Sequence, residues 1–84
     1  MAKSLHTPAY EQFRSLLASA RERAGLTQAG VAARLGRQQS FVAKYEGGER
    51  KLSAVEFIYV VQALGAKPAL AITQLTDAID NIER

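Results

Sequence analysis

Two short helical patterns separated by a tight turn, in residues 25–49, constrain the fold more than any other part of the chain. Thr27 is placed to cap the first pattern, because its hydroxyl can accept a hydrogen bond from a backbone N–H one turn later. Gly36 ends that pattern, since a left-handed C-terminal residue is nearly free of strain only for glycine. We therefore expect one helix at 28–35 and another at 38–46, held on a scaffold that the rest of the chain supplies.

Each of these two helices is expected to have one buried face. The apolar residues at helical spacing are Val31, Ala32 and Leu35 in the first helix, and Val42 and Tyr45 in the second. The side chains left facing outward on the second helix are Gln38, Gln39, Ser40 and Lys44. Gly30 is unfavourable within the first helix, because glycine inside a helix costs about 1 kcal/mol relative to alanine.

The segment resembles the helix-turn-helix of the lambdoid repressor and Cro-like (Xre-type) family of DNA-binding proteins. The matching residues are GLTQ at 25–28, Val31-Ala32, Leu35-Gly36, QSFVAKYE at 39–46, Gly48 and Arg50. The likeness extends over about residues 14–65. It implies an all-α fold, a compact bundle of about five short helices, with DNA binding as its activity.

Helix signals outside the segment divide the chain further. Residues 1–7 show no periodicity and are expected to form a flexible arm, with the helix-turn-helix domain at 8–65. Thr7-Pro8 predicts the start of a helix at 8–24, and Ser53 with Glu56 predicts a capping box that opens another at 54–64. Phe57, Val60, Val61 and Leu64 match core positions of the family, which leaves Val55, Ile58 and Tyr59 to face the tail or a second subunit.

Residues 66–84 allow two interpretations. Ile72, Leu75, Ile79 and Ile82 follow the 3-4-3 spacing of a helix-packing seam. Alternating residues at 70–73 and the threonines at 73 and 76 would instead suit a short strand. We favour the helix on its longer period. It would pack on its own domain or pair with a second copy, and the family resemblance implies a two-fold homodimer.

Composition limits the classes of function. Residues 1–51 carry a net charge of +5 and residues 52–84 carry −2, which suits binding of a polyanion by one end of the molecule as well as it suits an ordinary solvated surface. The chain has no cysteine, one histidine and no glycine-rich phosphate loop, so we expect no metal, no cofactor, no small-molecule ligand and no catalysis. Without a signal peptide or an apolar stretch of membrane-spanning length, we expect a cytoplasmic, nucleoid-associated protein and no membrane contact.

The resemblance also implies the roles of individual residues. Base edges would be read by Gln39, Ser40 and Lys44, with Phe41 and Ala43 available for apolar contact. Phosphates would be contacted by Gln28, Arg37, Gln38, Gly47, Arg50 and Lys51, with Gln28 also bracing Gln39. Arg21 and Glu46 would form a structural ion pair. Phe41 could equally fill the core, and Arg34 is expected to be a solvent-facing charge.

These inferences favour a transcriptional regulator that binds a two-fold double-stranded DNA operator as a homodimer. The alternative is a protein-interaction module, such as an antitoxin-like regulator, whose C-terminal segment binds a partner protein. The two alternatives differ in what the tail and the surface of Val55, Ile58 and Tyr59 contact.

Overall fold

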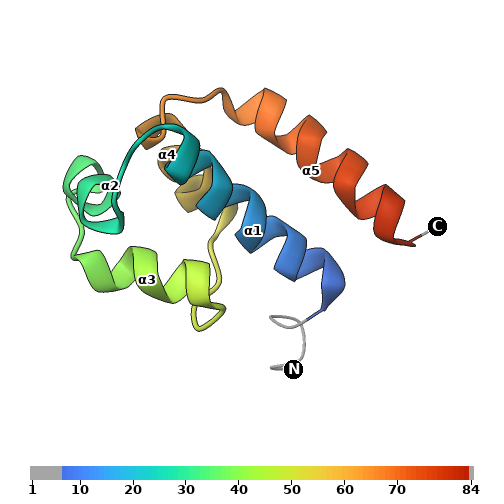
Figure 1. Cartoon of the computed structure of the whole chain (residues 1–84), viewed down its shortest axis with the longest axis horizontal. Coiled ribbons are helices and arrows are strands. Elements are labelled where there is room, and N and C mark those ends of the chain that lie inside the picture. Colours follow the sequence, from blue (N-terminus) through green and yellow to red (C-terminus); the bar gives the residue numbers. More distant parts are fainter. Residues whose placement is uncertain (1–6, 84) are drawn as a thin grey trace.

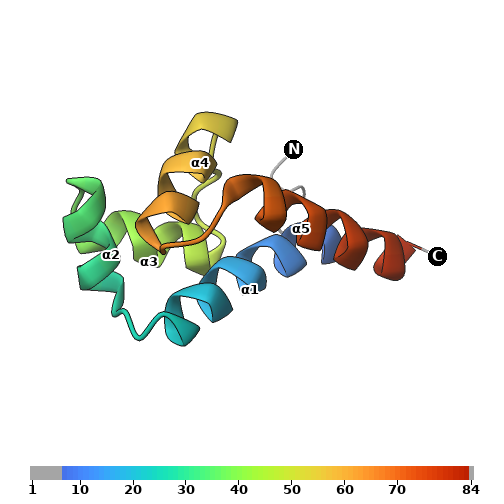
Figure 2. The same ribbon diagram turned by 90° about the horizontal axis from the view of Figure 1, so that it is seen from above.

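A computed structural model describes residues 7–83, which form five α-helices and, within that range, no strand. The helices are α1 (Pro8–Arg23), α2 (Gln28–Leu35), α3 (Gln39–Gly47), α4 (Ala54–Ala63) and α5 (Pro68–Glu83). In Figure 1, helix α1 crosses the middle of the view, with α3 on one side of it and α5 along the other. Figure 2 shows from a second direction that α5 runs alongside α1. The predicted all-α bundle is confirmed, while the predicted arm at 1–7 lies outside the described residues except for Thr7.

Local capping chemistry sets most of the helix ends. The hydroxyls of Thr7, Thr27 and Ser53 accept hydrogen bonds from N–H groups three residues later, which satisfies donors that have no partner within the helix. Gly36 and Gly48 end α2 and α3 with φ of 67° and 84°, a region that glycine enters without strain. The predicted bounds of α1, α3 and α4 differ from the observed ones by a single residue at their ends.

One apolar core joins all five helices. Its fully buried side chains include Leu17 of α1, Val31 of α2, Val42 and Tyr45 of α3, and Val60 and Val61 of α4. Helix α5 contributes the buried Ala71, so the C-terminal helix is part of the same core as the helix-turn-helix. Because α3 buries one face here, its opposite face is left at the surface.

The tail is helical, so the strand considered for residues 70–73 is not formed. The hydroxyls of Thr73 and Thr76 donate to the carbonyl oxygens of Ala69 and Ile72, each four residues earlier. These bonds let threonine sit inside a helix despite its preference for strands. The longer apolar period, which buries part of α5 against α1, decides the conformation.

Within residues 7–83, no single helix is long and apolar enough to cross a membrane. Helices α4 and α5 meet the criterion of length and composition only together, across a bend of 111°. Buried core helices meet the same criterion, and Val60 and Val61 of α4 are almost fully buried.

Candidate nucleic-acid interface

The outer face of α3 is polar and exposed. Gln39, Ser40 and Lys44 lie at the surface, while Phe41, Val42 and Tyr45 turn into the core. The side chains of Ser40 and Lys44 make no hydrogen bond or ion pair with the described residues, so their polar groups are free to meet a ligand. Ala43 is half-buried beside them. Helix α3 therefore presents hydrogen-bonding groups on a rigid, well-packed element.

A chain of side-chain hydrogen bonds connects α1 to the first residue of α3. Arg21 donates to Glu46 through Nε at 2.8 Å and through Nη2 at 3.1 Å. Gln28 donates from Nε2 to Oε1 of the same carboxylate at 2.9 Å. Gln39 then donates from Nε2 to Oε1 of Gln28 at 2.7 Å. The amide of Gln39 is thereby fixed in orientation, with its own oxygen left unbonded within this chain of contacts.

The ion pair at the base of this chain is shielded from water. The side chains of Arg21 and Glu46 are 15% and 8% exposed. Nη1 of Arg21 also donates to the carbonyl of Leu26 at 2.9 Å, which ties the guanidinium to the loop before α2. The hydrogen bonds to Glu46 raise the pKa of Arg21, so its guanidinium remains charged. Burial raises the pKa of the neighbouring Tyr45, which therefore stays neutral.

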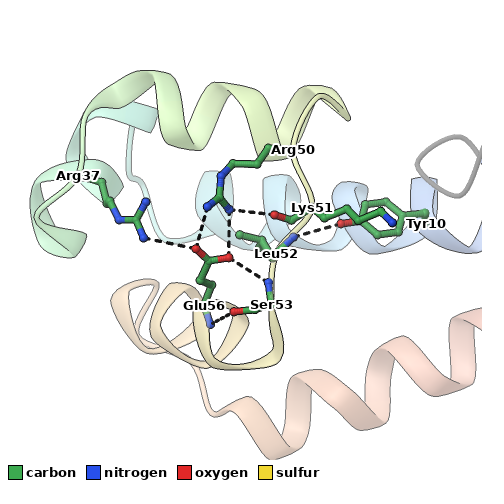
Figure 3. Close-up of polar contacts among 7 residues, drawn as sticks. All are labelled: Tyr10, Arg37, Arg50, Lys51, Leu52, Ser53 and Glu56. Atoms are coloured by element: carbon green, nitrogen blue, oxygen red, sulfur yellow. Dashed lines mark hydrogen bonds and ion pairs between the residues drawn. The ribbon is translucent and has the colours of Figure 1, made fainter. Parts of the chain in front are cut away.

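A second polar network flanks α3 at both of its ends (Figure 3). Arg37, in the turn before α3, donates to Oε2 of Glu56 at 3.3 Å. Arg50, in the loop after α3, donates to both oxygens of the same carboxylate, at 3.0 and 2.9 Å. Both guanidinium carbons lie over the ring of Phe41, 4.3 and 4.8 Å from its centroid, within the range of cation–π attraction.

Glu56 also belongs to the capping box of α4. Its Oε1 accepts from the backbone N–H of Ser53, and its own N–H donates to the hydroxyl of Ser53. The hydrogen bonds from Arg50 and from the N–H of Ser53 lower the pKa of Glu56 from 4.5 to about 2. The same bond to Glu56 raises the pKa of Arg50. Glu56 is therefore ionised at neutral pH.

The remaining predicted phosphate residues surround α3. Gln38 is the N-cap of α3 and makes no side-chain cap hydrogen bond. Gly47 is the exposed last residue of α3, and Lys51 is exposed in the loop beyond it. Arg34, expected to face solvent, is exposed but turns toward α4, where it donates to the carbonyl of Ala63 at 2.9 Å. That contact places a cation at the C-terminal end of a helix, where it is favoured.

Phe41, for which both alternatives were open, lies in the core with 8% of its surface exposed. Two guanidinium groups lie over its ring, so the outward side of the ring meets arginine and little solvent.

Two contributors were not predicted as part of the site. Nη1 of Arg14 donates to the carbonyl of Glu46 at 3.1 Å, and its guanidinium packs against the backbone of Gly48. Its position seven residues before Arg21 puts both arginines on one face of α1, a signal present in the sequence. Glu56 was predicted only as a cap, because no sequence rule connects it to Arg37 and Arg50.

The predicted seam on α5 is divided between core and surface. Leu75 and Ile79 are half-buried and line a shallow depression with Tyr10, Phe13 and Leu52. Ile72 and Ile82 remain 49% and 41% exposed. On α4, Val55, Ile58 and Tyr59 are likewise exposed, because the opposite face of the helix is the one buried in the core.

No cluster of three or more histidine, cysteine or acidic side chains that could hold a metal occurs within 7–83. A groove of about 480 Å³ lies beside the turn and is lined by Arg34, Arg37, Phe41, Glu56 and Tyr59 among others. Its polar lining is the network already described.

Comparison with known proteins agrees with this geometry. A family model described as a helix-turn-helix domain matches residues 12–71. A solved structure described as an XRE-family like protein from Pseudomonas syringae pv. tomato str. DC3000 is similar at 41% identity, over 89% of this chain and 92% of that one, with a TM-score of 0.82. No match is found among curated proteins. The chain belongs to the XRE-type helix-turn-helix family, and its fold is that of a DNA-binding regulator.

Proposed function

We propose that this protein is a transcriptional regulator that binds a specific double-stranded DNA operator as a homodimer. The observation that carries the proposal is the hydrogen-bond chain from Arg21 through Glu46 and Gln28 to Gln39. It fixes a hydrogen-bonding side chain at the first residue of an exposed helix, which is the end that meets base edges when such a helix enters the major groove.

The base-reading residues in this proposal are Gln39, Ser40 and Lys44. A glutamine can hydrogen-bond an adenine edge in two places, and a lysine can donate to guanine O6 and N7. Fixing Gln39 before DNA arrives reduces the conformational entropy lost on binding. Ala43 is half-buried on the same helix and would make apolar contact. Phe41 supports the arginines above it instead of reaching a thymine methyl.

Phosphate contacts are assigned to groups on both sides of α3. They are Gln28 at the start of α2, Gln38 and Arg37 in the turn, Gly47 at the end of α3, and Arg50 and Lys51 beyond the helix. The first turn of α3 lacks a side-chain cap, which suits its N–H groups to an anion. These contacts would fix the register of the protein on DNA and supply affinity that falls with salt.

A homodimer would place one α3 in each of two major grooves, with half-sites about 34 Å apart. We assign the interface to the exposed part of the α5 seam, Ile72 and Ile82, bordered by the half-buried Leu75 and Ile79. Removing the whole tail would not test this, because Ala71 belongs to the core. Point variants do so: Ile72→Glu with Ile82→Glu should give a monomer by light scattering. Leu70→Glu, on another face of α5, should stay dimeric.

The function itself is tested by selecting bound duplexes from a random pool, with light scattering of the free protein alongside. Enrichment of an inverted repeat and a dimer mass would support the proposal and identify the operator. Binding that shows no sequence enrichment and disappears with added salt would contradict it.

The competing proposal is a regulator whose purpose is to bind a second protein. Exposed Val55, Ile58 and Tyr59 on α4 favour an interaction surface of some kind. Tyr59→Lys separates the two proposals. If partner binding is the function, this variant should lose activity in the cell while keeping operator affinity and dimer mass. If DNA regulation is the function, the variant should regulate normally.

As a DNA-binding regulator, the protein would act in the cytoplasm, where its operator lies, with no cofactor and no catalytic step. We base this on family membership. The direction of regulation would follow from where the operator lies relative to a promoter.

A further inference from the structure

Glu56 holds together the two arginines that flank the recognition helix α3. Nη2 of Arg37 and Nη2 of Arg50 donate to the same oxygen, Oε2, at 3.3 and 2.9 Å (Figure 3). Nη1 of Arg50 reaches the other oxygen at 3.0 Å. One carboxylate on α4 therefore connects the turn before α3 to the loop after it.

The aromatic ring of Phe41 packs against the same two guanidinium groups. They lie 4.3 and 4.8 Å from the centroid of its buried ring. Two like charges this close repel one another, so the arrangement depends on the carboxylate between them. The backbone carbonyl of Lys51 adds a further acceptor for Nη1 of Arg50 at 2.9 Å.

The two arginines keep donors for a second anion. A guanidinium carries five N–H groups, of which Arg37 uses one and Arg50 leaves its Nε–H without a partner among the described residues. Arg37 and Arg50 remain 46% and 37% exposed. A phosphate could therefore accept hydrogen bonds from both arginines while Glu56 stays bound to them. The cluster offers that phosphate a net charge of +1 instead of +2.

We propose that Glu56 is a specificity-determining positioning residue, which orients Arg37 and Arg50 toward a DNA phosphate and cancels one of their two charges. This inference rests on the proposed DNA-binding function and deepens it. Sequence-independent binding is almost wholly electrostatic, so cancelling one charge weakens binding to every sequence. Orienting the arginines helps only the complex in which α3 is in register with its bases. The cancelled charge lowers the affinity for all DNA and the orientation restores affinity only for the operator, so together they widen the gap between operator and random DNA.

Glu56→Gln is the test variant, because glutamine keeps the length of the side chain and an acceptor for the N–H of Ser53. Asp80→Asn is the control for net charge, on the exposed surface of α5 across α1 from α3 (Figure 1). Ser53→Ala is the control for the cap, since it removes the hydroxyl bonded to the N–H of Glu56 and leaves the carboxylate charged.

The measurement is the affinity for two duplexes at 50 to 200 mM salt, followed by fluorescence anisotropy. One duplex has a random sequence, and the other is the one the wild-type protein enriches from a random pool. For the random duplex, Glu56→Gln should steepen the slope of log K against log salt by about 0.9, the value of one added phosphate contact. Its affinity relative to wild type should then be about 3.5-fold higher at 50 mM than at 200 mM salt.

The preference for the enriched duplex over the random one should fall at every salt concentration, because the freed charge strengthens binding to both duplexes while the arginines lose the orientation that favours the enriched one. Asp80→Asn and Ser53→Ala should leave both the slope and the preference unchanged. A purely structural role of Glu56 would lower the melting temperature without moving either quantity.

Equal slopes for Glu56→Gln and Asp80→Asn would overturn the charge-cancelling role. Equal strengthening of both duplexes by Glu56→Gln would overturn the positioning role. If the wild-type protein enriches no duplex, the proposed function fails and the specificity role fails with it, while the random-duplex slope still decides whether Glu56 offsets an arginine charge.

Discussion

Replacing Arg21 with methionine tests how much the buried ion pair between Arg21 and Glu46 stabilises the fold. The change keeps the length of the side chain and removes two hydrogen bonds to Glu46 and one to the carbonyl of Leu26. The carboxylate of Glu46 keeps only its bond from Gln28, in a place where the Glu46 side chain is 8% exposed. Leaving a buried charge without its partner costs about 3–5 kcal/mol, and the partial exposure of this pair reduces the expected loss to about 2–4 kcal/mol.

For a chain of this length, that loss should lower the melting temperature by at least about 10 °C, measured by circular dichroism together with urea unfolding. Arg23→Met, two residues later and exposed, is the matched control and should cost less than about 1 kcal/mol. The double variant Arg21→Met with Glu46→Met removes the stranded charge and should recover more than half of the loss. A double variant as unstable as Arg21→Met, or a single variant as stable as the control, would refute the reasoning.

Two further predictions concern the second network and the end of α3. Because the pKa of Glu56 is lowered from 4.5 to about 2, its ionised form stabilises the fold above about pH 4.5, and this contribution is lost as the pH falls toward 2. The difference in urea stability between wild type and Glu56→Gln should therefore shrink over that range, and a constant difference would contradict the assignment. Gly48→Ala should destabilise by at least about 1 kcal/mol, because φ is 84° and an added Cβ would lie 3.1 Å from Cζ of Arg14. Gly47→Ala, with its nearest neighbour at 3.9 Å and an ordinary φ, should be neutral or stabilising in the same unfolding assay.

The fold was predictable because its signals are local. Capping hydroxyls at Thr27 and Ser53 and the left-handed glycines at 36 and 48 act within one turn of their own positions. Apolar periodicity then decides which face of each helix is buried. It also decides the tail, where a period sustained to Ile82 outweighs the strand preference of two threonines.

The polar networks were harder to predict, because the reach of a long side chain spans several neighbours. Glu56 contacts Arg37 only because α4 packs beside the turn before α3. No rule of residue spacing in the sequence predicts that packing. Phe41 lies at the edge of the apolar face of α3, so helical periodicity alone did not decide whether its side chain would be buried or exposed. The contact between Gln28 and Gln39 followed from family resemblance, and periodicity alone would not have suggested it.

The most direct test of the account compares the sequences that two lysine variants select from a random pool. Lys44 lies on the outer face of α3, and Lys51 lies in the loop beyond it. Lys44→Ala should change the preferred base at one or two positions of the enriched site, with a loss of discrimination of about 1–3 kcal/mol there. Lys51→Ala should select the wild-type site with uniformly weaker binding. Identical selected sites for both variants and the wild type would contradict the claim that the outer face of α3 reads DNA.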